Sequence, residues 1–142
     1  MGFPVSKETA PARLPSSGGR MHALVVDDSR TVRKVLATYL EALGFDVTLA
    51  INGAEALDRL HGMEAADLVL LDWNMPEMDG IAFLRAVRAE ATYAALPVMI
   101  VTTNAELSHV SEALDAGANE YIMKPFTAEM VREKLDLLGF NV

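Results

Sequence analysis

The chain has 142 residues, which fits a single domain, and 51% of them are apolar, enough for a hydrophobic core. Its formal net charge of −8 argues against a basic binding surface, so we expect no binding to nucleic acid or to an anionic membrane. The chain has no cysteine and no apolar run long enough for a signal peptide or a membrane span, so disulfides and thiolate chemistry are excluded and we expect a cytoplasmic protein.

Residues 1–20 differ in composition from the rest of the chain. They contain three of the six prolines, end in Ser-Ser-Gly-Gly-Arg and show no apolar periodicity. Such a segment is typical of a flexible tail, so we expect a tail at 1–20 and one folded domain at 21–142.

From Met21 onward, strand and helix patterns alternate. Short apolar or alternating runs predict strands at 22–26, 45–50, 66–72, 97–103 and 119–124. Helical spacing and capping residues predict helices at 29–43, from 52, at 80–90, from 104 to before Gly117, and at 127–138, with N-caps at Ser29, Asn52, Asn104 and Thr127. Five β-α units of this kind predict an α/β fold, with a parallel sheet covered by helices on both faces.

Polar residues stand where four of the predicted strands end. The first strand runs into Asp27 and Asp28, the third ends in Asp72, the fourth reaches Thr102, and the fifth ends in Lys124. Each residue alone would be a turn, cap or surface residue. Because ligand sites of open parallel sheets lie outside the carboxyl ends of the strands, the set together predicts one polar site.

This set of side chains indicates a particular chemistry. Clustered carboxylates are hard oxygen ligands that suit Mg²⁺, and a cation would offset the repulsion between adjacent aspartates. An ionised aspartate can act as a nucleophile and form an acyl phosphate. A metal, an ammonium and a hydroxyl supply the charge stabilisation that phosphoryl transfer needs.

The chain resembles the receiver domains of two-component response regulators, and most closely the stand-alone, CheY-like receivers. The resemblance covers about residues 21–140 and rests on the segments "LVVDDS", "LVLLDWNMPEMDG", "VTT" and "GANEYIMKPF". It implies the flavodoxin/CheY-like fold, which is a doubly wound, five-stranded parallel sheet in the order 2-1-3-4-5 with five helices.

The resemblance also implies a role for each residue of the predicted site. Asp72 matches the phosphoacceptor, and Lys124 matches the lysine that contacts the phosphoryl group. Asp27 and Asp28 match the acidic pair that holds Mg²⁺ together with Asp72 and the backbone carbonyl of Asn74.

Further matches concern signalling. Thr102 matches the hydroxyl that turns toward the phosphoryl group, and Tyr121 matches the aromatic switch residue that follows it. Asn74 and Asn104 occupy positions that tune the lifetime of the phosphoryl group. The surface of the fourth helix, fifth strand and fifth helix would bind a partner, with contributions from Leu107, Val110, Leu114, Tyr121 and Lys134, although the helical spacing of the first three also fits a core stripe.

Together these matches predict a stand-alone response regulator of a two-component, chemotaxis-like system. We expect it to accept a phosphoryl group from a CheA-like histidine kinase, to bind a protein target such as the flagellar motor switch or another kinase, and to dephosphorylate itself. It would catalyse only its own phosphorylation and dephosphorylation. The printed chain continues for only 18 residues beyond Lys124, room for one helix, so we expect no output domain. We expect a monomer that can dimerise weakly on phosphorylation.

Three other functions would use an α/β fold with a polar site of this kind. A relay intermediate that passes its phosphate to a histidine phosphotransfer protein would have the same site. An aspartate-nucleophile phosphatase would need a second acid two residues after the nucleophile, where Asn74 stands. A flavodoxin-like cofactor site is disfavoured because two aspartates follow the first strand and would repel a phosphate. Trp73 is expected to be a partly exposed neighbour of the site, and His109 a surface histidine.

Overall fold

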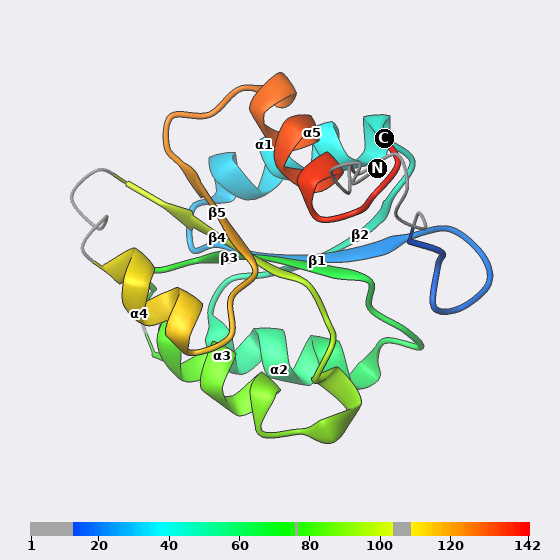
Figure 1. Ribbon diagram of the computed structural model, residues 1–142. Coiled ribbons are helices and arrows are strands. Elements are labelled where there is room, and N and C mark those ends of the chain that lie inside the picture. Colours follow the sequence, from blue (N-terminus) through cyan, green and yellow to red (C-terminus); the bar gives the residue numbers. More distant parts are fainter. Residues whose placement is uncertain (1–12, 76, 104–108) are drawn as a thin grey trace, which may run out of the picture.

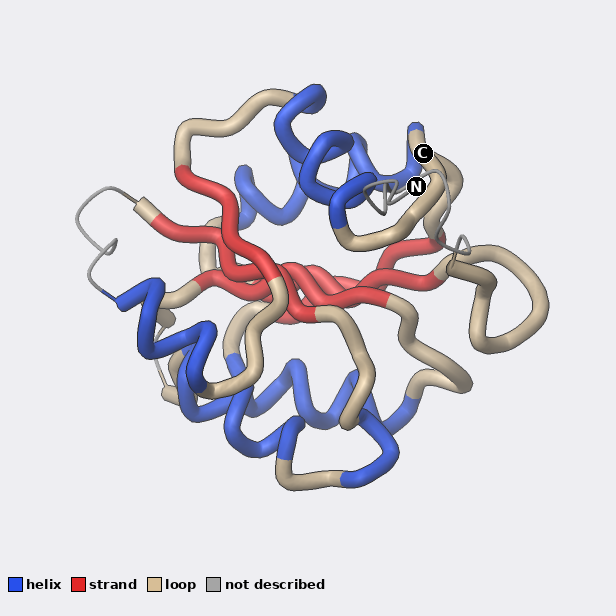
Figure 2. Tube along the Cα trace, viewed as in Figure 1, coloured by secondary structure: helices blue, strands red, loops and turns tan. Residues whose placement is uncertain are grey.

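The computed structural model describes residues 13–75, 77–103 and 109–142, and five parallel strands form one sheet at its centre (Figure 2). The strand order is β2-β1-β3-β4-β5, as predicted. The strands are β1 (His22–Val26), β2 (Asp46–Ala50), β3 (Leu68–Asp72), β4 (Val98–Thr102) and β5 (Glu120–Met123).

Helices cover both faces of this sheet (Figure 1). One face is covered by α1 (Arg30–Ala42) and α5 (Ala128–Leu137). The other is covered by α2 (Gly53–Gly62), α3 (Gly80–Arg88) and α4 (Val110–Asp115). The predicted doubly wound fold with five helices is therefore confirmed.

The alternation of side chains along β1 divides the core into two layers. Leu24 and Val26 join the apolar cluster under α2 and α3, whereas Ala23 and Val25 join the cluster under α1 and α5. Every residue of β3 and β4 is buried, as expected for central strands covered on both faces. This buried centre fixes where the ends of β1, β3 and β4 lie.

Most predicted helix boundaries are confirmed by their caps. The side chains of Ser29, Asn52 and Thr127 each accept a backbone N–H from the first turn of α1, α2 and α5. Asp79 caps α3 in the same way, which the sequence analysis did not predict, and a short 3₁₀ helix, η2 (Ala91–Tyr93), was also not predicted. The proposed cap Asn104 lies outside the described residues.

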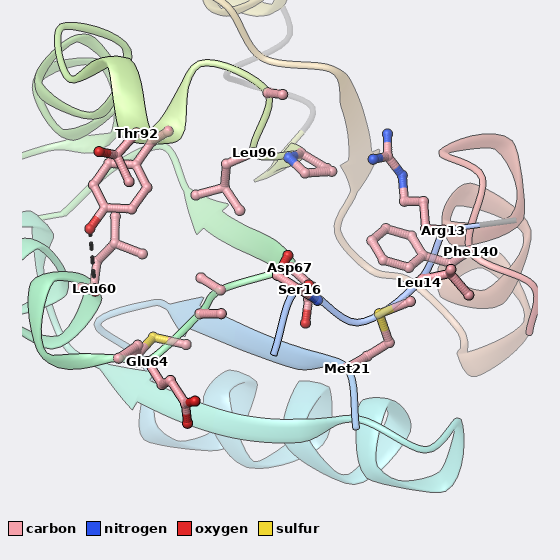
Figure 3. Close-up of a pocket in the computed structure, with 16 residues that line it drawn as sticks. Arg13, Leu14, Ser16, Met21, Leu60, Glu64, Asp67, Thr92, Leu96 and Phe140 are labelled. Carbon is pink, nitrogen blue, oxygen red and sulfur yellow. Dashed lines mark hydrogen bonds between the residues drawn. The ribbon is translucent and has the colours of Figure 1, made fainter. Parts of the chain in front are cut away.

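Residues 13–20 lie against the amino-terminal edge of the sheet (Figure 3). The Arg13 N–H donates to the Gly139 carbonyl at 3.0 Å, and the Arg13 guanidinium lies 5.3 Å from the centroid of the Phe140 ring. The Ser16 N–H donates to the Asp67 carboxylate at 2.8 Å. These contacts depart from the expectation of a flexible tail that reaches residue 20, because Asp67 and the end of α5 provide acceptors that no local pattern reveals.

The same residues form one wall of a cavity of about 470 Å³ at this edge of the sheet (Figure 3). Asp67 precedes β3 and Pro97 precedes β4, so the cavity lies at the opposite end of the strands from the predicted polar site.

Among the described residues, no helix has the length and apolar character that crossing a bilayer requires.

Candidate functional site

The carboxyl ends of β1 and β3 bring three carboxylates together, as predicted. Asp27, Asp28 and Asp72 each offer an oxygen, and these oxygens all lie within 4.8 Å of one another. Asp27 and Asp72 are buried, whereas Asp28 is exposed. The cluster therefore has a buried base and an opening toward solvent.

The backbone around Asp27 holds its carboxylate in place. The Asp27 N–H donates to the Ala50 carbonyl at 3.1 Å, which extends the β1–β2 pairing by one residue. Its Oδ1 accepts the Ser29 N–H at 2.8 Å, next to the start of α1. Its Oδ2 is buried and faces the ammonium of Lys124.

Lys124 brings the fifth strand into the site. Its Nζ lies 3.2 Å from Asp27 Oδ2 and donates to Asp72 Oδ1 at 3.4 Å. The Lys124 N–H donates to the Thr102 carbonyl, and the Lys124–Pro125 peptide is cis. One ammonium is thus shared between two buried carboxylates, so it does not neutralise the three-aspartate cluster.

This imbalance of charge alters the acidity of both partners. Burial raises the pKa of Asp72 to about 7, with a further rise from the Asp27 carboxylate that Lys124 only partly offsets. For Lys124, burial lowers the pKa, but the carboxylates of Asp72 and Asp27 outweigh it and leave the pKa above its ordinary value. The site therefore carries excess negative charge whenever Asp72 is ionised.

The residues present fit a divalent cation. The donors are hard carboxylate oxygens, which Mg²⁺ prefers, and the single Lys124 ammonium leaves the three carboxylates with an excess of negative charge that a cation would offset. A cation there would also favour the ionised form of Asp72. The resemblance to receiver domains implies a Mg²⁺ site at an acidic pocket, and this chain has the corresponding aspartate cluster.

The remaining predicted site residues lie at several places around this cluster. Thr102 is buried at the end of β4, and its hydroxyl donates to the Thr103 carbonyl at 3.4 Å. Asn74 is exposed just beyond Asp72, and Tyr121 is half-buried on β5. Asn104 lies outside the described residues.

The predicted partner surface is only partly described. On α4, Val110 is half-buried and Leu114 is 44% exposed, so Leu114 does not belong to the core that its spacing also allowed. Lys134 lies half-buried on α5, and Leu107 lies outside the described residues.

The expectation for Trp73 was wrong. Its side chain is only 6% exposed, and its ring stacks on that of His109, with 5.9 Å between the centroids. His109 is exposed, as expected, but it covers the residue that follows Asp72. Sequence spacing gave no signal for this contact, because it joins the β3–α3 loop to the residue before α4.

These features define an α/β protein of the flavodoxin/CheY-like class with an acidic pocket at the carboxyl edge of its sheet. The family model described as "Response regulator receiver domain" matches residues 23–136, and the chain belongs to this family. It is a response regulator receiver domain, from a family of signalling proteins.

Relatives and solved structures agree with this family. A chemotaxis protein CheY homolog of Campylobacter jejuni is 46% identical over 121 residues, which is 84% of this chain and 93% of that protein. Chemotaxis protein CheY1 of Helicobacter pylori is 41% identical over 123 residues, covering 85% of this chain and 99% of that one. The structure of the chemotaxis response regulator CheY4 of Vibrio cholerae has a TM-score of 0.79 at 31% identity, covering 84% of this chain and 99% of that chain. The predicted resemblance to stand-alone, CheY-like receivers is confirmed.

Proposed function

We propose that this receiver accepts a phosphoryl group on Asp72 from a histidine kinase of a chemotaxis-like two-component system. The observation that carries the proposal is the buried Asp72 carboxylate, which lies beside the Lys124 ammonium and clusters with the carboxylates of Asp27 and Asp28. This arrangement supplies a nucleophile, a cation for the transferred group and oxygen ligands for a metal. The relatives named as chemotaxis proteins support the choice of system.

In the transfer step, an oxygen of ionised Asp72 attacks the phosphorus of a phosphohistidine. A P–O bond forms while the P–N bond breaks, and the bonding electrons return to the imidazole. Lys124 already contacts Asp72 at 3.4 Å and would pair with a phosphoryl oxygen. Thr102, at the end of the neighbouring strand, would donate its hydroxyl to another.

A bound Mg²⁺ would neutralise charge on the phosphoryl oxygens. The carboxylates of Asp27, Asp28 and Asp72 would hold it together with the backbone carbonyl of Asn74. Asp27 is fixed through the Ser29 N–H, so its oxygens need little reorganisation to bind the ion.

Hydrolysis would end the signal. Water attacks the phosphorus of phospho-Asp72, the P–O bond to the carboxylate breaks, and inorganic phosphate leaves. Asn74, exposed beside the acceptor, and Asn104 would set the access of this water and so the lifetime.

For output, we propose that phosphorylation changes the surface of α4, β5 and α5, which then binds a protein target. Thr102 would turn toward the phosphoryl group, and Tyr121 would follow into the vacated space. The resemblance to stand-alone, CheY-like receivers makes the flagellar motor switch the first target to examine. We further propose that the protein acts as a cytoplasmic monomer, and that residues 21–142 form the functional unit.

Phosphorylation with acetyl phosphate and Mg²⁺ tests the assignment of Asp72. We expect the wild type to gain acid-labile phosphate, detected as a mass increase of the intact chain, and Asp72→Asn to gain none. Asp58→Asn is the control, because it removes the same charge at an exposed position on α2. Labelling of Asp72→Asn at the wild-type level would falsify the proposed acceptor.

The metal ligands are tested separately by Mg²⁺ titration of Trp73 fluorescence. Asp28→Asn removes one of three carboxylates, and we expect roughly a tenfold or greater loss of Mg²⁺ affinity. Asp58→Asn should leave the affinity nearly unchanged. If both variants bind Mg²⁺ equally well, Asp28 is not a ligand.

A further inference from the structure

A charged pair joins β5 to α5 beside the proposed switch residue, Tyr121. The Lys134 Nζ donates to Glu120 Oε1 at 3.0 Å and lies 4.7 Å from the centroid of the Tyr121 ring. The same Glu120 oxygen accepts the Tyr121 N–H at 3.0 Å. One carboxylate oxygen therefore contacts both the backbone of the switch residue and the ammonium that lies over its ring.

The Glu120–Lys134 pair is better shielded than an ordinary surface pair. The side chains of Lys134 and Glu120 are 28% and 21% exposed. By comparison, Arg132 and Glu129, which pair on the same helix at 3.4 Å, are 41% and 72% exposed. Partial burial reduces screening by water and salt, so the ion pair and the contact of the ammonium with the ring are both strengthened.

The position of the ring matters because Tyr121 lies between two environments. It is half-buried on β5 and packs against the apolar cluster on the α2, α3 and α4 side of the sheet. A rotation of the ring changes its contact with the ammonium. Because Glu120 holds Lys134, the ammonium cannot follow the ring freely.

We propose that Glu120 is a positioning residue that acts through Lys134 to hold Tyr121 in its unphosphorylated position. The pair thereby opposes the switch and lowers the fraction of the activated state in the absence of phosphate. The inference rests on the proposed function of Asp72 and Tyr121.

Thermodynamic linkage makes the inference measurable without knowledge of the partner. An interaction that stabilises the unphosphorylated arrangement must weaken the binding of a phosphoryl mimic to Asp72. Beryllofluoride with Mg²⁺ is such a mimic. We expect Glu120→Gln to bind it about two- to fivefold more tightly than the wild type, which is the range that a cation–π contact still accessible to water would give.

Glu129→Gln is the matched control. It removes the same charge, but from a pair on α5 that does not include Lys134, the residue whose ammonium lies over the Tyr121 ring. We expect its affinity for beryllofluoride to equal that of the wild type. A Glu120→Gln affinity equal to that of Glu129→Gln, or weaker than it, would overturn the proposal.

A double-mutant cycle tests the route through Lys134. If Glu120 acts by holding the ammonium, Lys134→Gln should tighten binding to a similar extent, and the double variant should tighten it no further than either single variant. The ring resonances of Tyr121 should shift toward their beryllofluoride-bound positions in all three variants. Additive tightening, or unmoved Tyr121 resonances, would contradict the route.

The experiment separates failure of this inference from failure of the proposed function. If the wild type binds no beryllofluoride in the presence of Mg²⁺, the proposed phosphoacceptor site is wrong, and the inference falls with it. If the wild type binds it and Glu120→Gln matches Glu129→Gln, only the role of Glu120 is wrong. Lys134→Gln provides the same test should Glu120→Gln fail to fold.

Discussion

Asp72 is both the proposed nucleophile and a source of instability in the metal-free protein. It is 4% exposed, and burial is the largest cause that raises its pKa to about 7, followed by the Asp27 carboxylate. Near neutral pH, part of the metal-free population therefore holds a proton on the oxygen that must attack phosphorus. A cation in the acidic cluster would favour the ionised nucleophile, which couples metal binding to reactivity.

The raised pKa of Asp72 predicts how stability depends on pH. In the unfolded chain this group ionises near its ordinary value of 3.8, whereas the folded protein keeps the proton up to about pH 7. Its contribution to stability is therefore full below pH 3.8 and is lost as the pH rises through 7. We expect Asp72→Asn, which does not titrate, to become more stable relative to the wild type between pH 5 and pH 8, by on the order of 2–3 kcal/mol.

Urea unfolding of both proteins in the presence of a chelator measures this difference. Added Mg²⁺ should narrow the gap at pH 8, because a cation stabilises the ionised wild-type site. A gap between the two proteins that is the same at pH 5 and pH 8 would show that Asp72 does not titrate in this window.

At the scale of elements, α3 begins directly against the backbone of the acceptor. The Gly80 N–H donates to the Trp73 carbonyl at 3.1 Å. A Cβ at Gly80 would lie 2.8 Å from the Asp72 carbonyl oxygen and 3.0 Å from the Trp73 Cα. Both neighbours are backbone atoms, so they cannot move aside as the end of a flexible side chain could.

Gly80→Ala should therefore shift α3 or the end of β3. We expect a loss of about 1–3 kcal/mol in the free energy of unfolding, together with slower phosphorylation by acetyl phosphate. Gly62→Ala is the control, because Gly62 also lies in a helix but a Cβ there meets nothing within 4 Å. That variant should be neutral or stabilised by up to about 1 kcal/mol. Equal melting temperatures for Gly80→Ala and the wild type would show that the loop accommodates the methyl group.

The elements whose sequence signals lie within the element itself or next to it were predictable from the sequence. The apolar runs of β3 and β4 and the caps Ser29 and Asn52 each lie within a few residues of what they determine. By contrast, η2 carries no apolar period. The loops beside it depend on Arg88, whose guanidinium donates to the carbonyls of Tyr93, Leu96 and Gly117.

The candidate site likewise contains some contacts that the sequence predicts and others that it does not. The sequence alone predicted that three residues, Asp27, Asp72 and Lys124, lie close together, because the carboxyl ends of parallel strands meet at one edge of a sheet. The Glu120–Lys134 pair and the Trp73–His109 stack could not, since they depend on how α5 and the residue before α4 pack against the sheet. Strand order determines which ends meet, whereas side-chain contacts between helix and sheet need the packed structure.

At the scale of the whole molecule, the candidate site and the contacts of residues 13–20 lie at opposite ends of the parallel strands. The carboxyl edge holds the acidic cluster, whereas the amino edge is covered by residues 13–20 (Figure 3). Asp67 joins this segment to the sheet, because its two oxygens accept the N–H groups of Ser16 and His22 at 2.8 and 2.9 Å. The family match begins only at residue 23, so this covering segment lies outside the matched region.

Two truncations test whether the segment stabilises the domain without affecting its chemistry. Deleting residues 1–20 removes the contacts of Arg13 with Gly139 and Phe140 and that of Ser16 with Asp67, so we expect a loss of roughly 1–2 kcal/mol in the free energy of unfolding. Deleting residues 1–12 leaves all of these contacts in place and should cost much less. Both truncated proteins should bind Mg²⁺ and beryllofluoride with wild-type affinity, because the cluster lies at the opposite edge of the sheet. Equal stability of the two truncated proteins would show that the contacts of residues 13–20 contribute nothing, and weakened beryllofluoride binding in the shorter one would show that the two edges are coupled.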